Sequence, residues 1–589
     1  MDVNPANRSA PNATTTSRPR LTRRAALRLL ATGSGVMLLA ACAPTPPVQS
    51  AAPTAAPAKP ADTAKPAAPA ATTAPAAAAK PADAPKPADS TAAKPAAPTM
   101  AVTTASGAKT TGQPKSGGTL RVGQVGDIPR IDGHLTTGSD TTWIPFDRLT
   151  AYDEKLQPQP MLAESWEQNK DQTQIKLNLR KGVEFHTGRE LTSEDVKWNV
   201  IWVRQPQIAS GALINQSKWW TEIETPDKYT VILKSDQPRP ATFDFFEYFN
   251  IVDRETAEGP EATTKMVGTG PFALAEWIQG DRLRFVKHKN YWDKGKPYLD
   301  EIHVTVHRDP QAMAAQIEAG TLDVAIAPPV GDYARLIDDP KYRGVTVPST
   351  TFVIGANTTM DPTNNKILRQ AINWAIDRQR IADVVFHKTV NPTSIPWIPS
   401  SDGYDAEKAK SYSLNLDKSK ALFAQTGLSN IELDVTTSTA VNDQLGVAQI
   451  LQFELAKIGI KLNVKTYEPG AYINQINNRR YQGIYVGNTA YASMQPITCI
   501  ANSRHLDSTG NSNSGFTSEK YRELHTAASI EPDLAKRKAL YAQITDLILD
   551  ESFTMPLASV PNRMVTRAAV QNIIGSRHGS LLYNEAWIE

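Results

Sequence analysis

The chain has 589 residues, which is too many for one hydrophobic core and predicts two or three domains. With 40% hydrophobic and 21% charged residues, the composition is that of a globular protein. Six arginines and one acid fall within residues 1–42, and lysines outnumber acids in residues 44–117, so the formal net charge of +3 comes from the N-terminal segments. The remainder is slightly negative, which argues against a nucleic-acid partner, because such a partner needs a concentrated basic face.

The first 42 residues have the pattern of a signal peptide. Arg23 and Arg24 precede an apolar run over residues 29–41, which is too short to span a bilayer comfortably. Leu-Ala-Ala-Cys at residues 39–42 fits the lipoprotein processing box and predicts that Cys42 is lipidated. We therefore expect export, and a lipid anchor that holds the protein at the outer face of the cytoplasmic membrane.

Two alternatives stay open for this segment. The apolar run could be an uncleaved anchor helix instead of a cleaved signal. The twin arginines resemble a Tat signal, but Ala26 stands where that signal usually has an aromatic residue, so the general secretory route is also possible.

Residues 43–117 are dominated by alanine, proline, lysine and threonine, with repeats of Ala-Lys-Pro-Ala. Such a composition cannot bury enough apolar surface to fold and predicts a disordered tether. Its reach would lie between roughly 50 Å as a flexible coil and roughly 230 Å as polyproline II. Cys499 is the only cysteine beyond Cys42, so we expect no intrachain disulfide and a small buried hydrophobic residue at that position.

Folded sequence is expected from about Gly118, where a short strand follows Gly-Gly. The stretch 267–329 alternates turns and strands, with a helix that begins after Asp309 and ends at Gly320. Strands and helices continue to alternate in the second half, which predicts a mixed α/β fold. The expected helices of that half cover Lys366–Ile376, Gln444–Ile458 and Leu534–Asp550, and the expected strands cover Thr351–Gly355, Ile431–Thr436 and Lys461–Thr466.

Three ordered blocks carry a resemblance to a known family. The chain resembles bacterial extracellular solute-binding protein family 5, the receptors of ABC importers for peptides, nickel complexes and some oligosaccharides, from about Gly118 to its end. The matching residues are Gly268-Thr269-Gly270-Pro271-Phe272 with Asn290-Tyr291-Trp292, then Leu179-Arg180-Lys181-Gly182-Val183 with Phe185-His186-Thr187-Gly188, and Arg369-Gln370-Ala371-Ile372 with Ala375-Ile376-Asp377-Arg378.

The resemblance implies a two-lobed periplasmic-binding-protein-like fold with a hinge and an interlobe cleft. Residues 118–350 would form the first lobe and residues 351–555 the second, with a return to the first lobe over residues 556–589. It implies capture of a peptide or similarly sized solute by hinge closure, and delivery to ABC permease subunits with their ATPase. An oligosaccharide or other neutral solute is the alternative within the family. A surface lipoprotein without transport, either a hydrolase or a sensor, is the alternative outside it.

Six residues are candidates for contacting the ligand. Asp132 and Trp143 lie in or beside a polar loop that, in the family, lies at the mouth of the cleft. The second-lobe candidates come from the Pro-Trp loop and from the segment that follows Gly487. They are Trp397, Asn488, Tyr491 and Ser493. Trp219 and Trp220 are further possibilities, of which only one would face a ligand if the pair lay on a strand.

No catalytic or metal-binding pattern survives inspection. His303 and His307 alternate with Ile302, Val304 and Val306, which predicts a strand and places the two imidazoles about 13 Å apart. Gly268 and Gly270 match a loose dinucleotide pattern, but Pro271 follows and no helix opens there. We therefore expect neither an enzyme nor a bound cofactor or metal.

The segment 487–496 lacks an acid. In peptide-binding members of the family, the corresponding segment ends in Asp-Pro and carries an aspartate that pairs with the peptide's ammonium group, whereas this chain reads Gly-Asn-Thr-Ala-Tyr-Ala-Ser-Met-Gln-Pro. A buried ammonium without a counter-charge costs several kcal/mol. Either Asp132 or Glu468 substitutes, or the ligand has no free amine at that place, which is the hypothesis we favour.

Overall fold

In the computed structural model, the described residues are 112–128, 130–134, 140–209 and 211–589. The predicted signal peptide, the lipidation at Cys42 and nearly all of the predicted tether lie outside them. Among the described residues no helix is long and apolar enough to cross a membrane.

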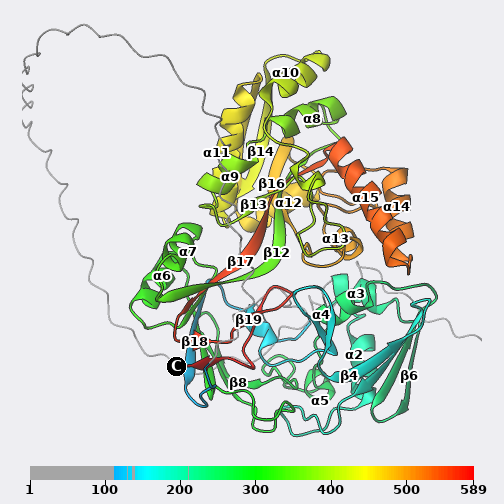
Figure 1. The fold of residues 1–589 in the computed structure, drawn as a ribbon, viewed down its shortest axis with the longest axis vertical. Helices are drawn as coiled ribbons and strands as arrows, with labels where there is room; N and C mark the ends of the chain where they lie inside the picture. Colours follow the sequence, from blue (N-terminus) through cyan, green and yellow to red (C-terminus); the bar gives the residue numbers. More distant parts are fainter. Residues whose placement is uncertain (1–111, 129, 135–139, 210) are drawn as a thin grey trace, which may run out of the picture. The chain divides into compact units, whose positions relative to one another are not determined.

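One long sheet runs through the molecule. Its strand order is β15-β14-β16-β12-β17-β11-β1-β10-β9-β8, and β13 also pairs with β17. The first lobe contributes one end of this sheet and the second lobe the other. Strands β12 (Tyr342–Ala356) and β17 (Thr554–Arg567) are antiparallel partners over most of their length and connect the two lobes, as Figure 1 shows. The predicted crossing at residues 351–355 falls within β12, and the predicted return at residues 554–557 begins β17.

The first lobe adds a second, four-stranded sheet of order β4-β5-β7-β6, against which α2, α3 and α4 pack a largely aromatic and aliphatic core. Its strands in the long sheet are β1 (Thr119–Gln124), β8 (Phe272–Ile278), β9 (Arg282–Lys287), β10 (Glu301–Val306) and β11 (Val324–Ile326). Its other strands are β2 (Thr150–Tyr152), β3 (Pro158–Pro160), β4 (Ala163–Gln168), β5 (Gln174–Leu179), β6 (Glu222–Asp227) and β7 (Thr230–Lys234). Its helices are α2 (Ser193–Trp202), α3 (Gly211–Ser217), α4 (Thr242–Tyr248), α5 (Arg254–Glu258), α6 (Pro310–Glu318) and α7 (Val330–Ile337), after the 3-10 turn Asp140–Trp143.

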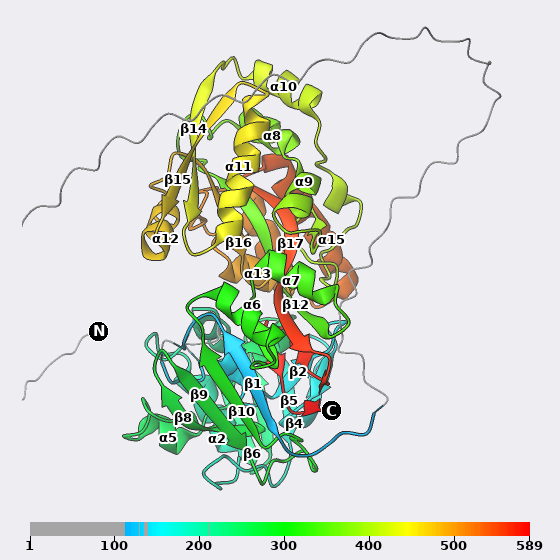
Figure 2. The ribbon, with the colours of Figure 1, turned by 90° about the vertical axis from the view of Figure 1, so that its left-hand side faces the viewer.

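In the second lobe, three strands that pair in parallel extend the sheet beyond β12 and are covered by helices. Strand β14 (Ile431–Ser438) pairs in parallel with β15 (Ile460–Tyr467) and β16 (Gly483–Thr489), and α11 (Asn442–Ala456) packs on β14 and β15 (Figure 2). The remaining elements are β13 (Asn391–Pro392) and the helices α8 (Lys366–Ala375), α9 (Arg378–Val384), α10 (Leu416–Gln425), α12 (Pro469–Asn477), α13 (Pro496–Asn502), α14 (Glu519–Ser529) and α15 (Leu534–Glu551). The chain ends in the first lobe with β18 (Val570–Gln571), β19 (Ile574–Gly575), β20 (Leu581–Leu582) and β21 (Trp587–Ile588).

The two glycines of the Gly-Thr-Gly motif lie against the backbone of residues 144–146. A Cβ on Gly268 would lie 2.3 Å from the carbonyl oxygen of Pro145, and one on Gly270 would lie 2.5 Å from the Pro145 carbonyl carbon. Next to them, the buried Asp147 carboxylate accepts hydrogen bonds from Trp292 Nε1 at 2.7 Å and from the Thr269 hydroxyl at 3.2 Å. The motif therefore has a structural role here: it fastens the start of β8 to the loop before Asp147.

Several sequence expectations are settled by these elements. His303 lies on β10, as its alternation with apolar residues predicted, and its Nε2 contacts Glu301 Oε2 at 2.6 Å. Cys499 is fully buried, as predicted. The idea that Trp219 and Trp220 could alternate on a strand is wrong, because both follow the last turn of α3; Trp220 is buried in the first-lobe core.

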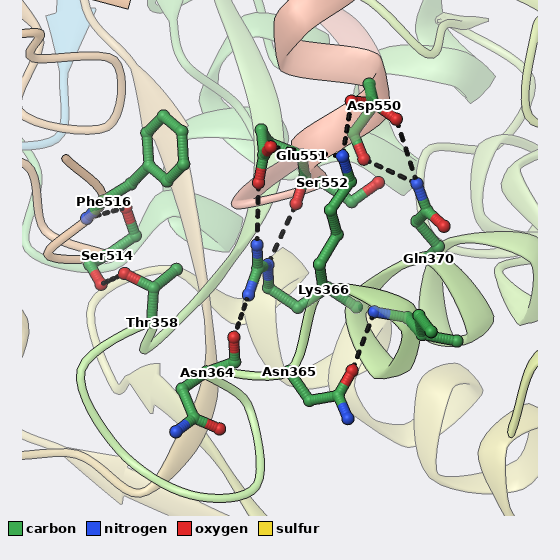
Figure 3. A network of polar contacts seen from close by, with 12 residues as sticks. Thr358, Asn364, Asn365, Lys366, Gln370, Ser514, Phe516, Asp550, Glu551 and Ser552 are labelled. Carbon is green, nitrogen blue, oxygen red and sulfur yellow. Dashed lines mark hydrogen bonds and ion pairs between the residues drawn. The ribbon is translucent and has the colours of Figure 1, made fainter. Parts of the chain in front are cut away.

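A polar network joins the start of α8 to the end of α15 (Figure 3). Lys366 pairs with Asp550 and Glu551, and Arg369 Nε donates to the Glu551 carbonyl at 2.9 Å. Arg369 Nη1 also donates to the carbonyls of residues 363 and 364. β17 starts three residues after Glu551. The network therefore fixes the end of α15 next to the point where the chain enters β17.

We expect the change Arg369→Leu to lower the free energy of unfolding by about 3 kcal/mol, because it leaves three carbonyl groups without their donor and removes one of the two cations that pair with the Glu551 carboxylate. Chemical denaturation measures this. The control is Arg335→Leu, which removes an exposed pair with Glu318 and should change stability by less than about 1 kcal/mol. Equal effects of the two changes would contradict the role assigned to Arg369.

Candidate functional site

A cavity of about 820 Å³ lies where the two lobes meet. This volume is in the range that small-molecule sites occupy, roughly 300–1,000 Å³. The first lobe lines it with Arg148, residues 152–155 and part of the C-terminal segment 574–582. The second lobe lines it with residues 389–393 and with the loop that holds Trp397. Its wall therefore contains side chains that hinge motion would separate.

Three charged or titratable side chains pack together beside the cavity. Arg148 Nη1 lies 2.7 Å from Glu247 Oε1 and 2.7 Å from His578 Nδ1, and all three residues are almost fully buried. Burial by itself would raise the pKa of Glu247, but the adjacent Arg148 charge holds that pKa below its ordinary value. Burial, together with the adjacent Arg148 charge, lowers the pKa of His578 to about 3.

His578 is therefore neutral near pH 7, and its tautomer follows from its partners. Nδ1 lies 2.7 Å from Arg148 Nη1 and 3.2 Å from Glu247 Oε1; arginine can only donate, so at the shorter of these contacts Nδ1 accepts from Arg148. The ring proton then lies on Nε2, which faces the hydroxyls of Ser576 and Ser580. Arg148 thus forms an ion pair with Glu247 and also donates a hydrogen bond to the neutral imidazole of His578.

Aromatic rings continue from His578 toward the second lobe. The Trp143 ring stacks on His578 with centroids 3.6 Å apart. Tyr248, at the end of α4, lies 6.2 Å from Trp143 and 5.0 Å from Tyr491 of the second lobe, measured between ring centroids. Tyr491 has a left-handed backbone with φ of 60°, so the turn after β16 brings its ring to this position. These rings form an apolar contact between the lobes.

Asp244 on α4 makes polar contacts with the second lobe. Its carboxylate accepts from the backbone N–H of Gln495 at 3.1 Å and from the Thr498 hydroxyl. It also accepts from the Tyr152 hydroxyl, at 2.8 Å, within its own lobe. Burial raises the pKa of Asp244 to about 6, although these hydrogen bonds act in the opposite direction. Asp244 is therefore a titratable group at the contact between the lobes.

Arg577 also bridges the lobes. Its Nη1 donates to the Ser400 hydroxyl of the second lobe at 2.9 Å, and its Nε donates to the Asp153 carbonyl of the first lobe at 3.1 Å. The Ser493 hydroxyl of the second lobe donates to the Arg577 carbonyl at 2.9 Å.

The structure distributes the six predicted ligand contacts over different places. Of the six, Trp397 lines the cavity, and its Nε1 donates to the Thr545 hydroxyl at 2.8 Å. Trp143, Tyr491 and Ser493 take part in the contacts beside the cavity. Asp132 pairs with Arg130 at 2.7 Å and accepts from the His134 N–H. Asn488 is exposed on β16, opposite Phe352 of β12.

Sequence reasoning missed the polar residues that matter most at this contact. Asp244 and Glu247 could have been noticed, because two acids within the aromatic run Thr-Phe-Asp-Phe-Phe-Glu-Tyr suggest buried carboxylates that need partners. Arg148, Arg577 and His578 gave no local signal, since their partners lie far away along the chain. No group of three or more His, Cys, Asp or Glu side chains within the described ranges could hold a metal ion.

Comparison with known proteins places this fold. The model of bacterial extracellular solute-binding proteins, family 5, matches residues 157–511. The chain belongs to this family. Heme-binding protein A of Haemophilus influenzae is 29% identical over 350 residues, which cover 53% of this chain and 63% of that protein. Di/tripeptide-binding protein 2 of Pseudomonas aeruginosa is 24% identical over 453 residues, covering 71% and 84% respectively.

A solved structure agrees with the two-lobed architecture. The binding protein AgaA of A. tumefaciens R10, in complex with agropinic acid, superposes with a TM-score of 0.68 at 26% identity and covers 80% of this chain and 99% of its own. The predicted fold class, two α/β lobes with a hinge between them, is confirmed. The members of this family are extracellular binding proteins, and the relatives named above are binding proteins.

Proposed function

We propose that this protein is the extracytoplasmic receptor of an ABC importer, which captures a peptide or similarly sized solute between its lobes and delivers it to the membrane permease and its ATPase. The observation that carries the proposal is the cavity of about 820 Å³ whose wall is shared by both lobes. A ligand that contacts both lobes stabilises only the closed arrangement, so binding shifts the population toward it. The permease can then distinguish loaded from empty receptor by shape.

The location of the protein is part of the proposal. Lipidation of Cys42 would hold it at the outer face of the cytoplasmic membrane, and residues 43–117 would tether the folded part at a distance from the lipid. More than one acyl chain is needed for stable anchoring.

The ligand is proposed to lack a free amine at the segment 487–496. Asp244 is the acid that forms a hydrogen bond with this segment, at Gln495. Its carboxylate already accepts hydrogen bonds from Gln495, Thr498 and Tyr152. Of the two substitutes considered from sequence, Asp132 pairs with Arg130, and Glu468 is exposed to solvent just before α12. A solute without an ammonium group avoids the cost of a buried, unpaired charge.

The test uses the protein purified from its own cell envelope. We expect mass spectrometry to detect a released small solute without a primary amine, and small-angle scattering to give a larger radius of gyration once the solute has been removed. Restoring the solute should reverse the change. Identical scattering profiles with and without solute would contradict a hinge-closing receptor and favour a rigid sensor or a hydrolase. A released peptide with a free amino terminus would contradict only the assignment of the ligand.

A further inference from the structure

Arg577 is a buried cation without an anionic partner. It is 6% exposed, it lines the interlobe cavity, and it forms no ion pair with any carboxylate of the described residues. Its two side-chain hydrogen bonds go to neutral oxygens, the Ser400 hydroxyl and the Asp153 carbonyl. A buried charge of this kind is costly unless an opposite charge joins it.

The acids whose charges act on Arg577 are Glu247, Glu154 and Asp153, and none of the three forms an ion pair with it; Glu154 is exposed to solvent. The Asp153 carboxylate accepts from the backbone N–H groups of Lys155 and Gln157 and from the Gln159 amide, all within its own turn. Glu247 is paired with Arg148. Within the described part of the chain, no carboxylate therefore pairs directly with the positive charge of Arg577.

Arg378 is one of several other buried arginines, and like Arg577 it has no ion pair within the described residues; it differs from Arg577 in how its donors are used. It is 5% exposed, and each of its three nitrogens donates to an oxygen of the protein. In Arg577, Nη2 has no hydrogen-bond partner among the described residues, while Nε and Nη1 have one each. A guanidinium carries five N–H groups in a planar fork, so Arg577 retains donors for a carboxylate.

We infer that Arg577 is the subsite for an acidic group of the ligand, a carboxylate or an equivalent oxyanion. The inference rests on the proposed function and narrows its ligand class to solutes that carry at least one negative charge. Both lobes hold the Arg577 side chain and backbone, through Asp153 on one side and through Ser400 and Ser493 on the other. An anion bound there would bind to a group whose position depends on closure, so charge recognition and closure are coupled.

Calorimetry on the full chain, stripped of solute, tests the inference with two matched probe pairs. One pair is N-acetyl-trialanine and its C-terminal amide; the other is trigalacturonic acid and its methyl ester. Within each pair the two molecules share a backbone and differ in charge. We expect at least one acid to bind tenfold or more tightly than its neutral counterpart.

Variants separate recognition from structure. Arg577→Gln should reduce the affinity for the acid to that for the neutral counterpart while leaving the neutral probe's affinity unchanged, and Arg577→Lys should retain part of the preference. Lys155→Gln removes an exposed charge at the rim of the same cavity and should alter the preference less than twofold. The inference is overturned if no acid binds more tightly than its neutral counterpart, or if Arg577→Gln weakens both members of a pair equally. Neither result changes the scattering test, which decides the receptor function separately.

Discussion

Replacing Gly270 with alanine is expected to lower the free energy of unfolding by about 4 kcal/mol or more, enough to prevent accumulation of the folded protein. The added Cβ would lie 2.5 Å from the Pro145 carbonyl carbon, 2.6 Å from the Phe146 nitrogen and 2.8 Å from the Ile144 carbonyl oxygen. All three are backbone atoms, so no side chain can rotate away. The loop would have to move, and the hydrogen bond from the Gly270 N–H to the Pro145 carbonyl would be lost.

Gly470→Ala is the matched control. Gly470 lies in α12, where nothing lies within 4 Å of an added Cβ, so alanine should leave stability unchanged or raise it by about 0.5–1 kcal/mol. Expression level and denaturant midpoint of the two variants measure the difference. A Gly270→Ala protein that folds with near-normal stability would show that the loop at residues 144–146 is not rigid.

The second large effect concerns pH. Burial raises the pKa of Asp244 to about 6 from an ordinary 3.8, and Gln495 and Thr498 of the second lobe contact its carboxylate, so we expect the closed form to hold a proton that an open, solvated Asp244 releases. Stabilisation of the closed form is thus fully present below about pH 4 and is lost as pH rises to about 6 and beyond. From this shift we expect the closed-to-open ratio of the solute-free chain to fall about tenfold between pH 5 and pH 7.5.

Energy transfer between dyes on the two lobes measures this ratio. Val384 and Ile201 are exposed positions in the second and first lobes and suit Val384→Cys and Ile201→Cys, because the native Cys499 is buried and unreactive. In Asp244→Asn the tenfold change should disappear. Asp147 is a useful comparison, since burial also raises its pKa to about 6 but its partners all belong to the first lobe. If the pH dependence persists in Asp244→Asn, another group controls closure.

The positions of many helices and strands could be predicted from the sequence, because short-range patterns determine them. β10 and α8 follow apolar periodicities that a few neighbouring residues define, and Asp309 caps α6 as its position before Pro310 predicted. The order of the strands in the long sheet could not be predicted from the sequence. β1 lies between β10 and β11, both in parallel, although nearly two hundred residues separate it from them, and no local pattern encodes that pairing.

The candidate site was the least predictable part for the same reason. Arg148 meets Glu247 about a hundred residues away and His578 more than four hundred residues away, so their charges balance only after folding. Trp397 could be proposed because a Pro-Trp loop is conspicuous in a sequence. Asn488 was proposed on its position alone, and its exposed place on β16 shows how a shift of one residue along a strand turns a side chain to the other face.

The pairing of β12 with β17 also bears on how such receptors can be diversified. The chain leaves the first lobe through β12 and returns to it through β17. Gly355 of β12 and Thr554 of β17, at the second-lobe end of these strands, are direct partners in the ladder. The whole lobe is therefore an insertion whose ends are neighbours. An insertion of that kind can be exchanged as a block between homologous chains while the remaining lobe keeps its own hydrogen bonds. Grafting at this pair of residues would combine the first lobe of one such protein with the second-lobe wall of another's cavity.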